Sequence, residues 1–557
     1  MASTYVSQGT TTRLSAADVD ASTKSASENI KRQAFTEWPN DAGFEGLTEH
    51  RGPIELKVNG AIPIWASGSL YRTGPGQCKV DDVKNKTETF HISHWFDGLA
   101  HTHRFDLVPG GEDGQVKVLY SSRRQSDKIV ADIKETGLLR AISFGQKADP
   151  CVGLFSKFTS VFNKRQDLVT VGVTVNANLP LTEPGSVTLG TDAAIMCRID
   201  PKTMEPMGSP TTQATFHPDL KGPLSGAHGI VDPETGDYIN YNLELGKTAL
   251  YRIFRLNAAT GKTDILAVIP SKAAYIHSFF MTQNYVVLCI PVAHYAWNGL
   301  KVPLEGNFLD AMKPFDPNET CRWFVVDRRQ GRGVVGEFAS PARFFFHTVN
   351  AFEDGNGDVN CEVVDYPNRY IIDGFYYDVL LNRNDKGREF LAEGQMEHKS
   401  FPRLSRYCLR RKDFVTGAKV LPVPECVMEV SYPHAGDMPV INPKYVCKRH
   451  RYDYLLTSRF LSTMFDSITK VDTETRELLR WEGPHGHTPG EAVFVPHPGG
   501  DGEVLGEDDG VLLSVVLDGG NRRSYLLCLD ARSMTELGRA ECEFAVAIGL
   551  HGRHVLG

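Results

Sequence analysis

Short apolar runs joined by polar turns recur along the chain, and this alternation is its main signal of secondary structure. In each copy a strand-like run is followed by Asp or Asn, then by turn residues that include Thr or Gly, and then by a second run. Asp and Asn side chains cap tight turns and Gly tolerates the bend, so each copy predicts a β-hairpin. The copies contain Asp200, Asp232, Asn257, Asp327, Asp413, Asp472 and Asp530.

These hairpins predict an all-β fold and favour a β-propeller, in which small antiparallel sheets surround a central axis. Successive copies lie 25 to 86 residues apart, so uneven blades with long insertions are expected. A large β-sandwich with many hairpins is the alternative. In a propeller, residues that are distant in the chain can meet, because the innermost strand of each blade lines the axis.

The best helical pattern lies between Asp127 and Phe162. Phe155, Phe158 and Phe162 fall on one face of a helix there, with basic residues nearby. Such a helix can lie on a membrane surface, or it can pack its aromatic face into the core. Peripheral contact with a membrane is therefore compatible with the sequence but not required by it.

Composition and charge narrow the class of protein. The chain has 557 residues, of which 41% are hydrophobic and 23% charged, and its net charge is −8. These values are typical of a globular enzyme and do not favour nucleic-acid binding. No P-loop or dinucleotide fingerprint occurs, so we expect no nucleotide cofactor. The 11 cysteines form no CxxC pair, which indicates a reducing compartment, and we expect a cytoplasmic protein.

The N-terminal region differs in composition from the rest of the chain. Residues 1–45 are rich in Ser, Thr, Ala and charge, and no apolar signal-peptide core occurs there, so they predict a flexible arm. Residues 46–557 are expected to form a single β-propeller catalytic domain with cap insertions. No apolar stretch approaches the ~18 residues that a transmembrane helix needs.

Four histidines in short apolar segments are the candidates for a metal site: His228 in LSGAHGI, His277 in AAYIHSFF, His347 in RFFFHTVNAF and His551 in AIGLHG. An imidazole in such surroundings is expected to stay neutral and needs a partner for its nitrogens. One metal ion bound by all four would be that partner, and imidazole suits iron, zinc, copper or nickel. A histidine satisfied within the core is the alternative at each position, and the spacings match no local zinc motif.

A second group of histidines is a less favoured candidate. His91, His94, His101 and His103 lie close together in the chain, and the last two alternate on one face of a predicted strand. We interpret them as part of a structural blade edge.

Several sequence blocks together resemble a known family. They are LYRTGPGQCKV, HISHWFDGLAHTHRFDL, SGAHGIVDPETG, YIHSFFMTQNYVVLCIP, FFFHTVNAFEDGNG, EAVFVPHPGG and IGLHG, in that order along the chain. Over about residues 45 to 557 the chain resembles the carotenoid cleavage oxygenases, in particular their fungal torulene- and retinal-forming branch. It departs from the family at Gly229, where Pro commonly follows the histidine.

The resemblance implies a seven-bladed propeller with Fe(II) on its central axis and a small helical or loop cap over one face. It implies that His228, His277, His347 and His551 bind the iron. It further implies that three carboxylates accept the free N–H groups of three of these rings, which fixes the tautomer. Glu491 stands at one such position, and Asp192 and Asp437 stand at the other two, where Glu is more usual. Because aspartate is one methylene shorter, a water molecule is one way to span the gap.

The implied activity is that of a non-heme Fe(II) dioxygenase that cleaves one C=C bond of a carotenoid or apocarotenoid with O2 into two carbonyl compounds. Phenolic aryl alkenes, such as stilbenes and isoeugenol-type phenylpropenes, are the alternative small apolar substrates. Relatives that cleave them hold the phenolic oxygen with a Tyr and a Lys. Arg124 stands at the Tyr position, which disfavours this alternative, whereas Lys134 or Lys147 can take the Lys role. Phe155 is the candidate for apolar substrate contact.

Two other function classes stay open at this level. A metal-dependent isomerase-hydrolase is known on the same fold, and fold alone does not decide chemistry. A non-catalytic propeller scaffold would need neither iron nor the four histidines. Turnover without oxygen would favour the first, and full function after substitution of His347 would favour the second. Nothing in the sequence predicts the oligomeric state.

Overall fold

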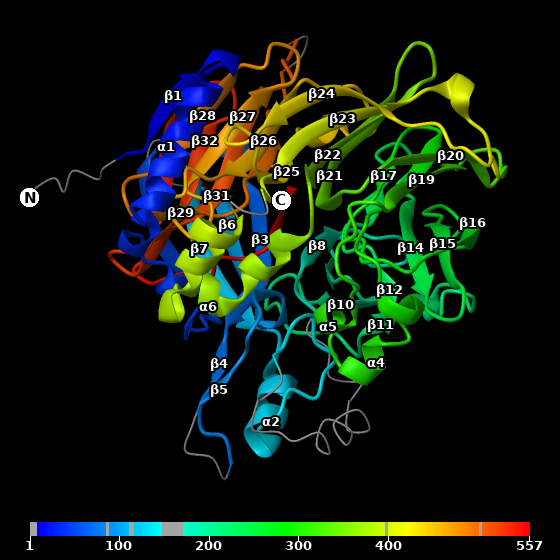
Figure 1. Cartoon of the computed structure of the whole chain (residues 1–557). Coiled ribbons are helices and arrows are strands. Elements are labelled where there is room, and N and C mark those ends of the chain that lie inside the picture. Colours follow the sequence, from blue (N-terminus) through cyan, green and yellow to red (C-terminus); the bar gives the residue numbers. More distant parts are fainter. Residues whose placement is uncertain are drawn as a thin grey trace, which may run out of the picture.

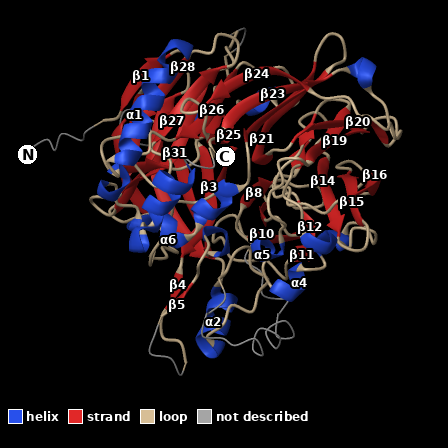
Figure 2. Cartoon of the chain, viewed as in Figure 1, coloured by secondary structure: helices blue, strands red, loops and turns tan. Residues whose placement is uncertain are grey.

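The fold is mostly β, as the alternating pattern predicted. The computed structural model describes residues 8–84, 89–110, 116–147, 171–395, 399–500 and 504–556. Its antiparallel strands form curled sheets in a propeller-like arrangement, and most of the helices are short (Figures 1 and 2).

Four sheets each consist of strands that follow one another along the chain, as in a meander of hairpins. The first contains β8 (Thr174–Ala177), β9 (Val187–Gly190), β10 (Ile195–Ile199) and β11 (Thr211–Thr212). The second contains β12 (Leu224–Ser225), β13 (Ile230–Val231), β14 (Tyr238–Glu244), β15 (Ala249–Leu256) and β16 (Thr263–Ser271). The third contains β17 (Phe280–Met281), β18 (Tyr285–Ile290), β19 (Thr320–Asp327) and β20 (Val334–Pro341). The fourth contains β21 (Phe344–Glu353), β22 (Val359–Tyr366), β23 (Arg403–Leu409) and β24 (Glu425–Ser431).

A fifth sheet takes up the N-terminal strand. Its consecutive strands are β25 (Asp437–Val440), β26 (Tyr452–Thr457), β27 (Ser467–Asp472) and β28 (Leu478–Glu482). β1 (Thr10–Leu14) pairs antiparallel with β28, so that Thr12 lies opposite Arg480. In Figure 1 the blue β1 lies beside β28 at the left of the molecule.

The two ends of the chain also meet in a ten-stranded sheet of order β29-β31-β32-β33-β2-β7-β6-β3-β34, with β30 paired to β31. The N-terminal strands are β2 (Ile54–Gly60), β3 (Gly68–Gln77), β6 (Leu99–Pro109) and β7 (Val116–Arg124). The C-terminal strands are β29 (His487–Pro489), β30 (Val493–Pro496), β31 (Gly510–Asp518), β32 (Arg523–Asp530), β33 (Glu536–Glu541) and β34 (His551–Leu556). A small separate pair is formed by β4 (Lys79–Val80) and β5 (Phe90–His91).

The prediction of a flexible arm over residues 1–45 is wrong for the part that begins with β1. After that strand comes α1 (Val19–Lys31), which buries Ala26 and Ile30. Farther on, the Nε1 of Trp38 donates a hydrogen bond to Thr488 Oγ1 at 2.9 Å. A few apolar residues at the right spacing are enough to dock a segment whose overall composition is polar.

The predicted hairpin turns occur at most of their positions, and their capping mechanism is visible. Asp472 Oδ1 accepts hydrogen bonds from the backbone N–H groups of Glu474 and Thr475 in the turn between β27 and β28. Similar backbone contacts are made by Asp200, Asp232, Asn257, Asp327 and Asp530. Asp413 differs, because it ends the 3-10 helix Arg411–Asp413 within the longer connection between β23 and β24.

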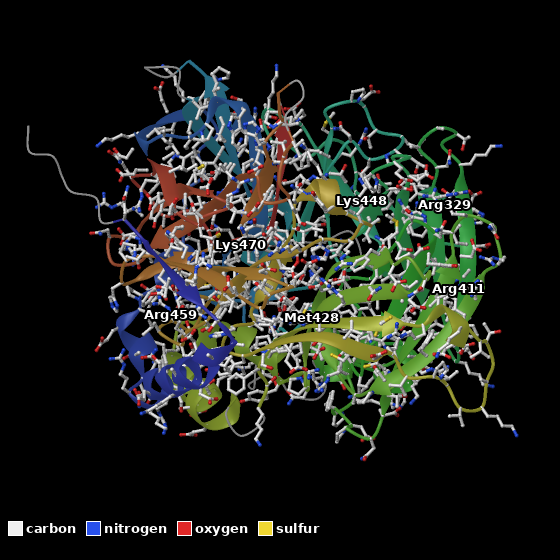
Figure 3. All side chains as sticks on the ribbon, turned by 90° about the horizontal axis from the view of Figure 1, so that it is seen from above. Arg329, Arg411, Met428, Lys448, Arg459 and Lys470 are labelled. Atoms are coloured by element: carbon white, nitrogen blue, oxygen red, sulfur yellow. The ribbon has the colours of Figure 1, made fainter. Side chains whose placement is uncertain are left out.

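The middle strands of some sheets are buried on both faces, although β22 also contains the buried polar residues Asn360, Glu362 and Asp365. Every residue of β18 and of β22 is buried, as expected where a sheet packs between two neighbouring sheets. In the view from above, side chains fill the space between the ribbons (Figure 3). In the same view Arg459 lies on the opposite side of the molecule from Arg329 and Arg411.

Helices and loops gather beside the sheets near the predicted helical region. α2 (Asp127–Thr136), α4 (Val302–Glu305) and α5 (Phe308–Ala311) lie together at the bottom of Figure 1. Residues 137–145 form bends and an isolated bridge at Ser143 instead of continuing the predicted helix, because Gly137 ends α2 in the left-handed conformation. The predicted aromatic helix face at Phe155 lies outside the described residues. Within the described part of the chain, no helix is long and apolar enough to cross a bilayer.

Candidate metal centre and its cavity

The four candidate histidines come from four different sheets or their connecting loops. His228 lies between β12 and β13, and His277 lies in the loop before β17. His347 belongs to β21, and His551 is the first residue of β34. In Figure 1 the C-terminus is at the centre of the view, close to β21 and β25. The long sequence separations are therefore bridged by the arrangement of the sheets.

The imidazole nitrogens of these residues converge. His228 Nε2 lies 3.1 Å from His277 Nε2 and 3.0 Å from His551 Nε2. His347 Nε2 lies 3.2 Å from His551 Nε2, and ligand atoms of all four rings lie within 4.8 Å of one another. Two imidazole nitrogens that bind one metal ion at about 2.1 Å are roughly 3.0 to 3.4 Å apart, depending on the angle between the bonds. The spacing in this cluster therefore suits a single metal ion.

The surroundings favour neutral rings. Burial, followed by the proximity of the other three histidines of the cluster, holds the pKa of His228 well below its ordinary value. Burial and the neighbouring rings hold the pKa of His551 well below that value too. A neutral imidazole keeps a lone pair for a cation, whereas four protonated rings at this spacing would repel one another.

Three of the rings donate their other nitrogen directly to a carboxylate, at 2.7 Å in each case. The pairs are His277 Nδ1 with Asp192 Oδ1, His347 Nδ1 with Asp437 Oδ1, and His551 Nδ1 with Glu491 Oε1. Each contact fixes the ring's tautomer, so that Nε2 faces the cluster without a hydrogen. The aspartates reach their histidines directly, so the bridging water considered from the sequence is not needed.

A further set of residues binds the second oxygen of each carboxylate. Tyr275 Oη donates to Asp192 Oδ2 at 3.2 Å, and Tyr366 Oη donates to Asp437 Oδ2 at 2.7 Å. Burial raises the pKa of both tyrosines well above its ordinary value, so they stay neutral donors. The third carboxylate accepts instead from a cation, Arg72, whose Nη1 lies 2.8 Å from Glu491 Oε2.

The chemistry of this assembly suits a metal cation. Four imidazole rings present nitrogens to one point, and three carboxylates lie directly behind three of the rings. A carboxylate that accepts the N–H of a ring increases the basicity of the ring's other nitrogen, which strengthens its bond to a metal ion.

A cavity of about 570 Å³ opens beside three of the four histidines. His277, His347 and His551 line it together with their three carboxylate partners, and most of the remaining wall is apolar and aromatic. In that wall the rings of Phe96 and Phe375 stack with their centroids 5.2 Å apart. A concave apolar site with a few polar groups at one point is typical of a small-molecule site whose chemistry occurs at that point.

Known proteins with the same sequence pattern identify the family. The family described as retinal pigment epithelial membrane protein matches residues 43–556. A carotenoid dioxygenase of Neurospora crassa is 44% identical over 99% of this chain and 96% of its own length. A torulene dioxygenase of Gibberella fujikuroi is 45% identical over 95% of each chain. The chain belongs to the carotenoid cleavage oxygenase family.

Solved structures agree with this family's fold. A variant of the Synechocystis apocarotenoid oxygenase matches with a TM-score of 0.72 and 20% identity, covering 94% of this chain and 99% of the other. A cobalt-substituted form of the same enzyme matches with a TM-score of 0.70 and 21% identity over the same shares of the two chains. The likeness extends over nearly the whole chain, so the insertions do not alter the architecture.

The departure from the family at Gly229 has a local structural cause. A Cβ atom at this position would lie 2.2 Å from Tyr238 Oη, so the tyrosine ring occupies the space of a side chain. Tyr238 Oη accepts a hydrogen bond from Asn240 Nδ2 at 2.8 Å, which holds the ring in place. The residue after His228 is therefore small because β14 supplies a large neighbour.

The predicted substrate-contact residues are not brought together. Lys134 Nζ lies 3.7 Å from an oxygen of Asp82, and Lys147 Nζ lies 3.8 Å from an oxygen of Asp378. Neither lysine is among the described residues that line the cavity. Phe155 lies outside the described residues. A substrate-binding role for any of them stays a prediction.

Sequence reasoning missed Arg72, Tyr275 and Tyr366. Arg72 is a charged residue inside the apolar block LYRTGPG, and a charge at such a position is a signal of a buried partner. Tyr275 precedes His277 by two residues, so the two can lie on the same side of an extended segment. For Tyr366, at the end of β22, the local sequence offers no comparable signal.

A second metal-capable group among the described residues consists of Glu362, His450 and Asp453. Arg406 Nε donates to Glu362 at 2.8 Å, and His450 Nε2 contacts Asp453 at 2.9 Å. The guanidinium already compensates charge in this buried network. Among the described residues, His91, His94, His101 and His103 form no group that could hold a metal ion, and the rings of His101 and His103 lie beside each other with their centroids 4.4 Å apart.

Proposed function

We propose that this chain is a non-heme iron dioxygenase that cleaves one C=C bond of a carotenoid or apocarotenoid with O2 and releases two aldehydes. The observation that carries the proposal is the convergence of four imidazole Nε2 atoms at the wall of a large apolar cavity. The fungal relatives named carotenoid dioxygenase and torulene dioxygenase support it at 44% and 45% identity. The substrate supplies the electrons in such a reaction, so no nucleotide cofactor is required.

We infer that the propeller has seven blades and that the iron site lies on its axis. The ten-stranded sheet accounts for two blades if it is divided at β2, which pairs with β33 on one side and with β7 on the other. The five other large sheets of the described chain account for the rest. Support for the axial position comes from the four ligand histidines, which arise from separate blades under this division. Residues 46–557 then form one catalytic domain with cap insertions.

His228, His277, His347 and His551 would hold Fe(II). Bound iron supplies the means to activate O2 for reaction with an electron-rich double bond. The neutral four-imidazole set and the carboxylates behind three of its rings support a divalent ion. Iron is the member of that class which suits an oxygenase.

The protein's own residues bind and orient the alkene and exclude water. The aromatic wall around Phe96, Phe346 and Phe375 offers flat apolar surfaces to a polyene. Asp192, Asp437 and Glu491 hold the histidine rings, so the ligand set does not need to reorganise when the substrate enters. Which double bond is cleaved then depends on how far the polyene extends into the cavity.

We also propose that the enzyme touches membranes peripherally, where apolar polyenes dissolve. Leu304 lies in α4 and is 56% exposed. Trp297 lies in the short 3-10 helix Ala296–Gly299 just before α4 and is 63% exposed. This region adjoins the loop that contains Ile142, because Ser143 N donates to Gly306 O at 3.2 Å. Ile142 is itself 44% exposed and also lines the cavity. An exposed apolar patch that reaches the cavity wall suits transfer of a substrate from lipid.

The proposal is tested by substrate turnover with iron-loaded protein. A panel of carotenoids, apocarotenoids, a 4-hydroxystilbene and isoeugenol is supplied in air and without oxygen, and products are separated by chromatography. We expect apocarotenals from the polyenes in air and none without oxygen. Aromatic aldehydes as the main products would assign the chain to the aryl-alkene branch, and oxygen-free turnover would favour the isomerase-hydrolase class. Protein with His347→Ala is the control for adventitious oxidation.

A further inference from the structure

The three carboxylates at the metal centre are alike toward their histidines but differ on the other side. Asp192 and Asp437 each receive a neutral tyrosine hydroxyl at the second oxygen. Glu491 instead receives a guanidinium from Arg72 and the backbone N–H of Gly552, both at 2.8 Å. Within the described part of the chain, the carboxylate that contacts His551 is therefore the one with a cationic partner.

Arg72 lies in a place shaped for it. The residue is 2% exposed, and its guanidinium also donates to the backbone oxygens of Glu491 at 3.2 Å and of Leu550 at 3.3 Å. A Cβ atom at position 552 would lie 2.5 Å from Arg72 Cδ, so Gly552 leaves room for the arginine stem. Strand β3, which carries Arg72, pairs with β34, which carries His551.

Arg72 holds Glu491 from the side away from the histidine. Glu491 Oε1 contacts His551 Nδ1 at 2.7 Å, while Arg72 Nη1 and the backbone N–H of Gly552 donate to Oε2 at 2.8 Å each. The side chains of Arg72 and Glu491 are only 3% and 9% exposed, so water has little access to replace the guanidinium. Removing one partner of a buried pair is strongly unfavourable. Without Arg72, we therefore expect Glu491 to lose the orientation that fixes the His551 ring.

We propose that Arg72 is a positioning residue that acts through Glu491: its guanidinium holds this carboxylate against His551 Nδ1 and thereby fixes the direction in which the His551 ring faces the metal ion. The proposal rests on the proposed function, because it assumes a divalent ion among the four histidines. The role differs from that of Tyr275 and Tyr366, which supply a hydrogen bond without charge.

A double-mutant cycle separates this positioning role from simple packing. Full-length protein, freed of metal, is titrated with Co(II) alone, and affinity is measured by competition with a chelator. The visible absorption of bound Co(II) reports the coordination environment. The variants are Arg72→Met, Glu491→Gln, the double variant, and Arg72→Lys. Tyr366→Phe is the matched control that removes a hydrogen bond and no charge.

We expect Arg72→Met to weaken Co(II) binding by roughly 10- to 100-fold in the wild-type background. In the Glu491→Gln background the same substitution should change Co(II) affinity by less than about threefold, because the carboxylate through which Arg72 acts is already removed. Arg72→Lys should keep more affinity than Arg72→Met, and Tyr366→Phe should cost only roughly 3- to 10-fold. The Co(II) spectrum of Arg72→Met should differ from that of the wild type.

Equal losses of Co(II) affinity from Arg72→Met in both backgrounds would overturn the inference and would show that Arg72 acts by packing alone. In that case Co(II) binding by the wild type would still leave the proposed function intact. Failure of the wild type to bind Co(II) at all would overturn the proposed function, and the inference with it. If Arg72→Met does not fold, Arg72→Lys is measured in the wild-type and in the Glu491→Gln backgrounds, and a loss of affinity that is confined to the wild-type background supports the inference. Equal losses from Arg72→Lys in both backgrounds would contradict it.

Discussion

Two short side chains hold two rings of the four-histidine cluster in place. Asp192 and Asp437 reach their histidines at 2.7 Å, although the family more commonly uses the longer glutamate. Tyr275 and Tyr366 bind the opposite oxygens and hold both aspartates from behind. The length that aspartate lacks is therefore made up by the backbone position and not by a bridging molecule.

The ligand assignment predicts a loss of metal on substitution of single histidines. His277→Ala and His347→Ala should retain less than roughly a tenth of the wild-type metal and lose activity, because removal of one ligand opens the site to water. Metal content by mass spectrometry and far-UV circular dichroism test this. His554→Ala is the matched control, since its ring contacts the backbone oxygen of Ala66 at 3.1 Å and not the cluster. Normal metal content in either ligand variant would refute the assignment.

A second residue-scale prediction concerns the carboxylates. Asp437→Asn preserves size but removes the charge that orients His347, so kcat/KM should fall roughly 10- to 100-fold. Steady-state kinetics with iron-loaded protein measure this, and metal content is determined in parallel. Asp453→Asn, in the separate buried network, provides a control for general destabilisation. An unchanged rate with Asp437→Asn would remove this carboxylate from the site.

At the scale of elements, the N-terminal region is the main difference between expectation and structure. β1 extends the sheet of β25–β28, and α1 buries Ala26 and Ile30 against the rest of the molecule. Only a few residues of this segment are apolar, so average composition does not reveal them. An edge strand that pairs through its backbone leaves little trace in the side-chain pattern.

Deletion of residues 1–31 should therefore destabilise the protein, whereas a flexible arm would be dispensable. Loss of the β1 pairing and of the buried α1 side chains is expected to cost on the order of 2 kcal/mol or more, which lowers Tm by a few degrees. Differential scanning calorimetry compares this variant with the full chain. An unchanged Tm after the deletion would contradict the docking of this segment.

The sequence predicted much of the remaining architecture for a clear physical reason. Turn capping is local, so Asp472 and Asp530 could be located from a few neighbouring residues. The pairing of β3 with β34 joins the two ends of the chain, and no local pattern encodes such a contact. The four candidate ligand histidines were selected through family motifs, whereas the contacts of Arg72 and Tyr366 depend on packing between sheets and could not be assigned from spacing.

At the scale of the whole molecule, the cavity and the exposed apolar patch next to α4 suggest how an apolar substrate arrives. Trp297→Glu combined with Leu304→Glu should reduce binding to phosphatidylcholine vesicles at least about tenfold, because both side chains lose favourable burial in lipid. Co-sedimentation measures this. Val420→Glu, at an 87% exposed position elsewhere, is the matched control. Equal binding by the patch variant and the control would contradict a role of this surface.

The central claim is that O2 is split between the two halves of a cleaved polyene at the four-histidine site. The most direct measurement is mass spectrometry of the products formed from a carotenoid by iron-loaded protein under ¹⁸O₂, with rapid reduction of the aldehydes to prevent exchange with water. We predict one ¹⁸O atom in each of the two products, and no product from the His347→Ala variant. Products without label, or label in only one of the two aldehydes, would contradict the account.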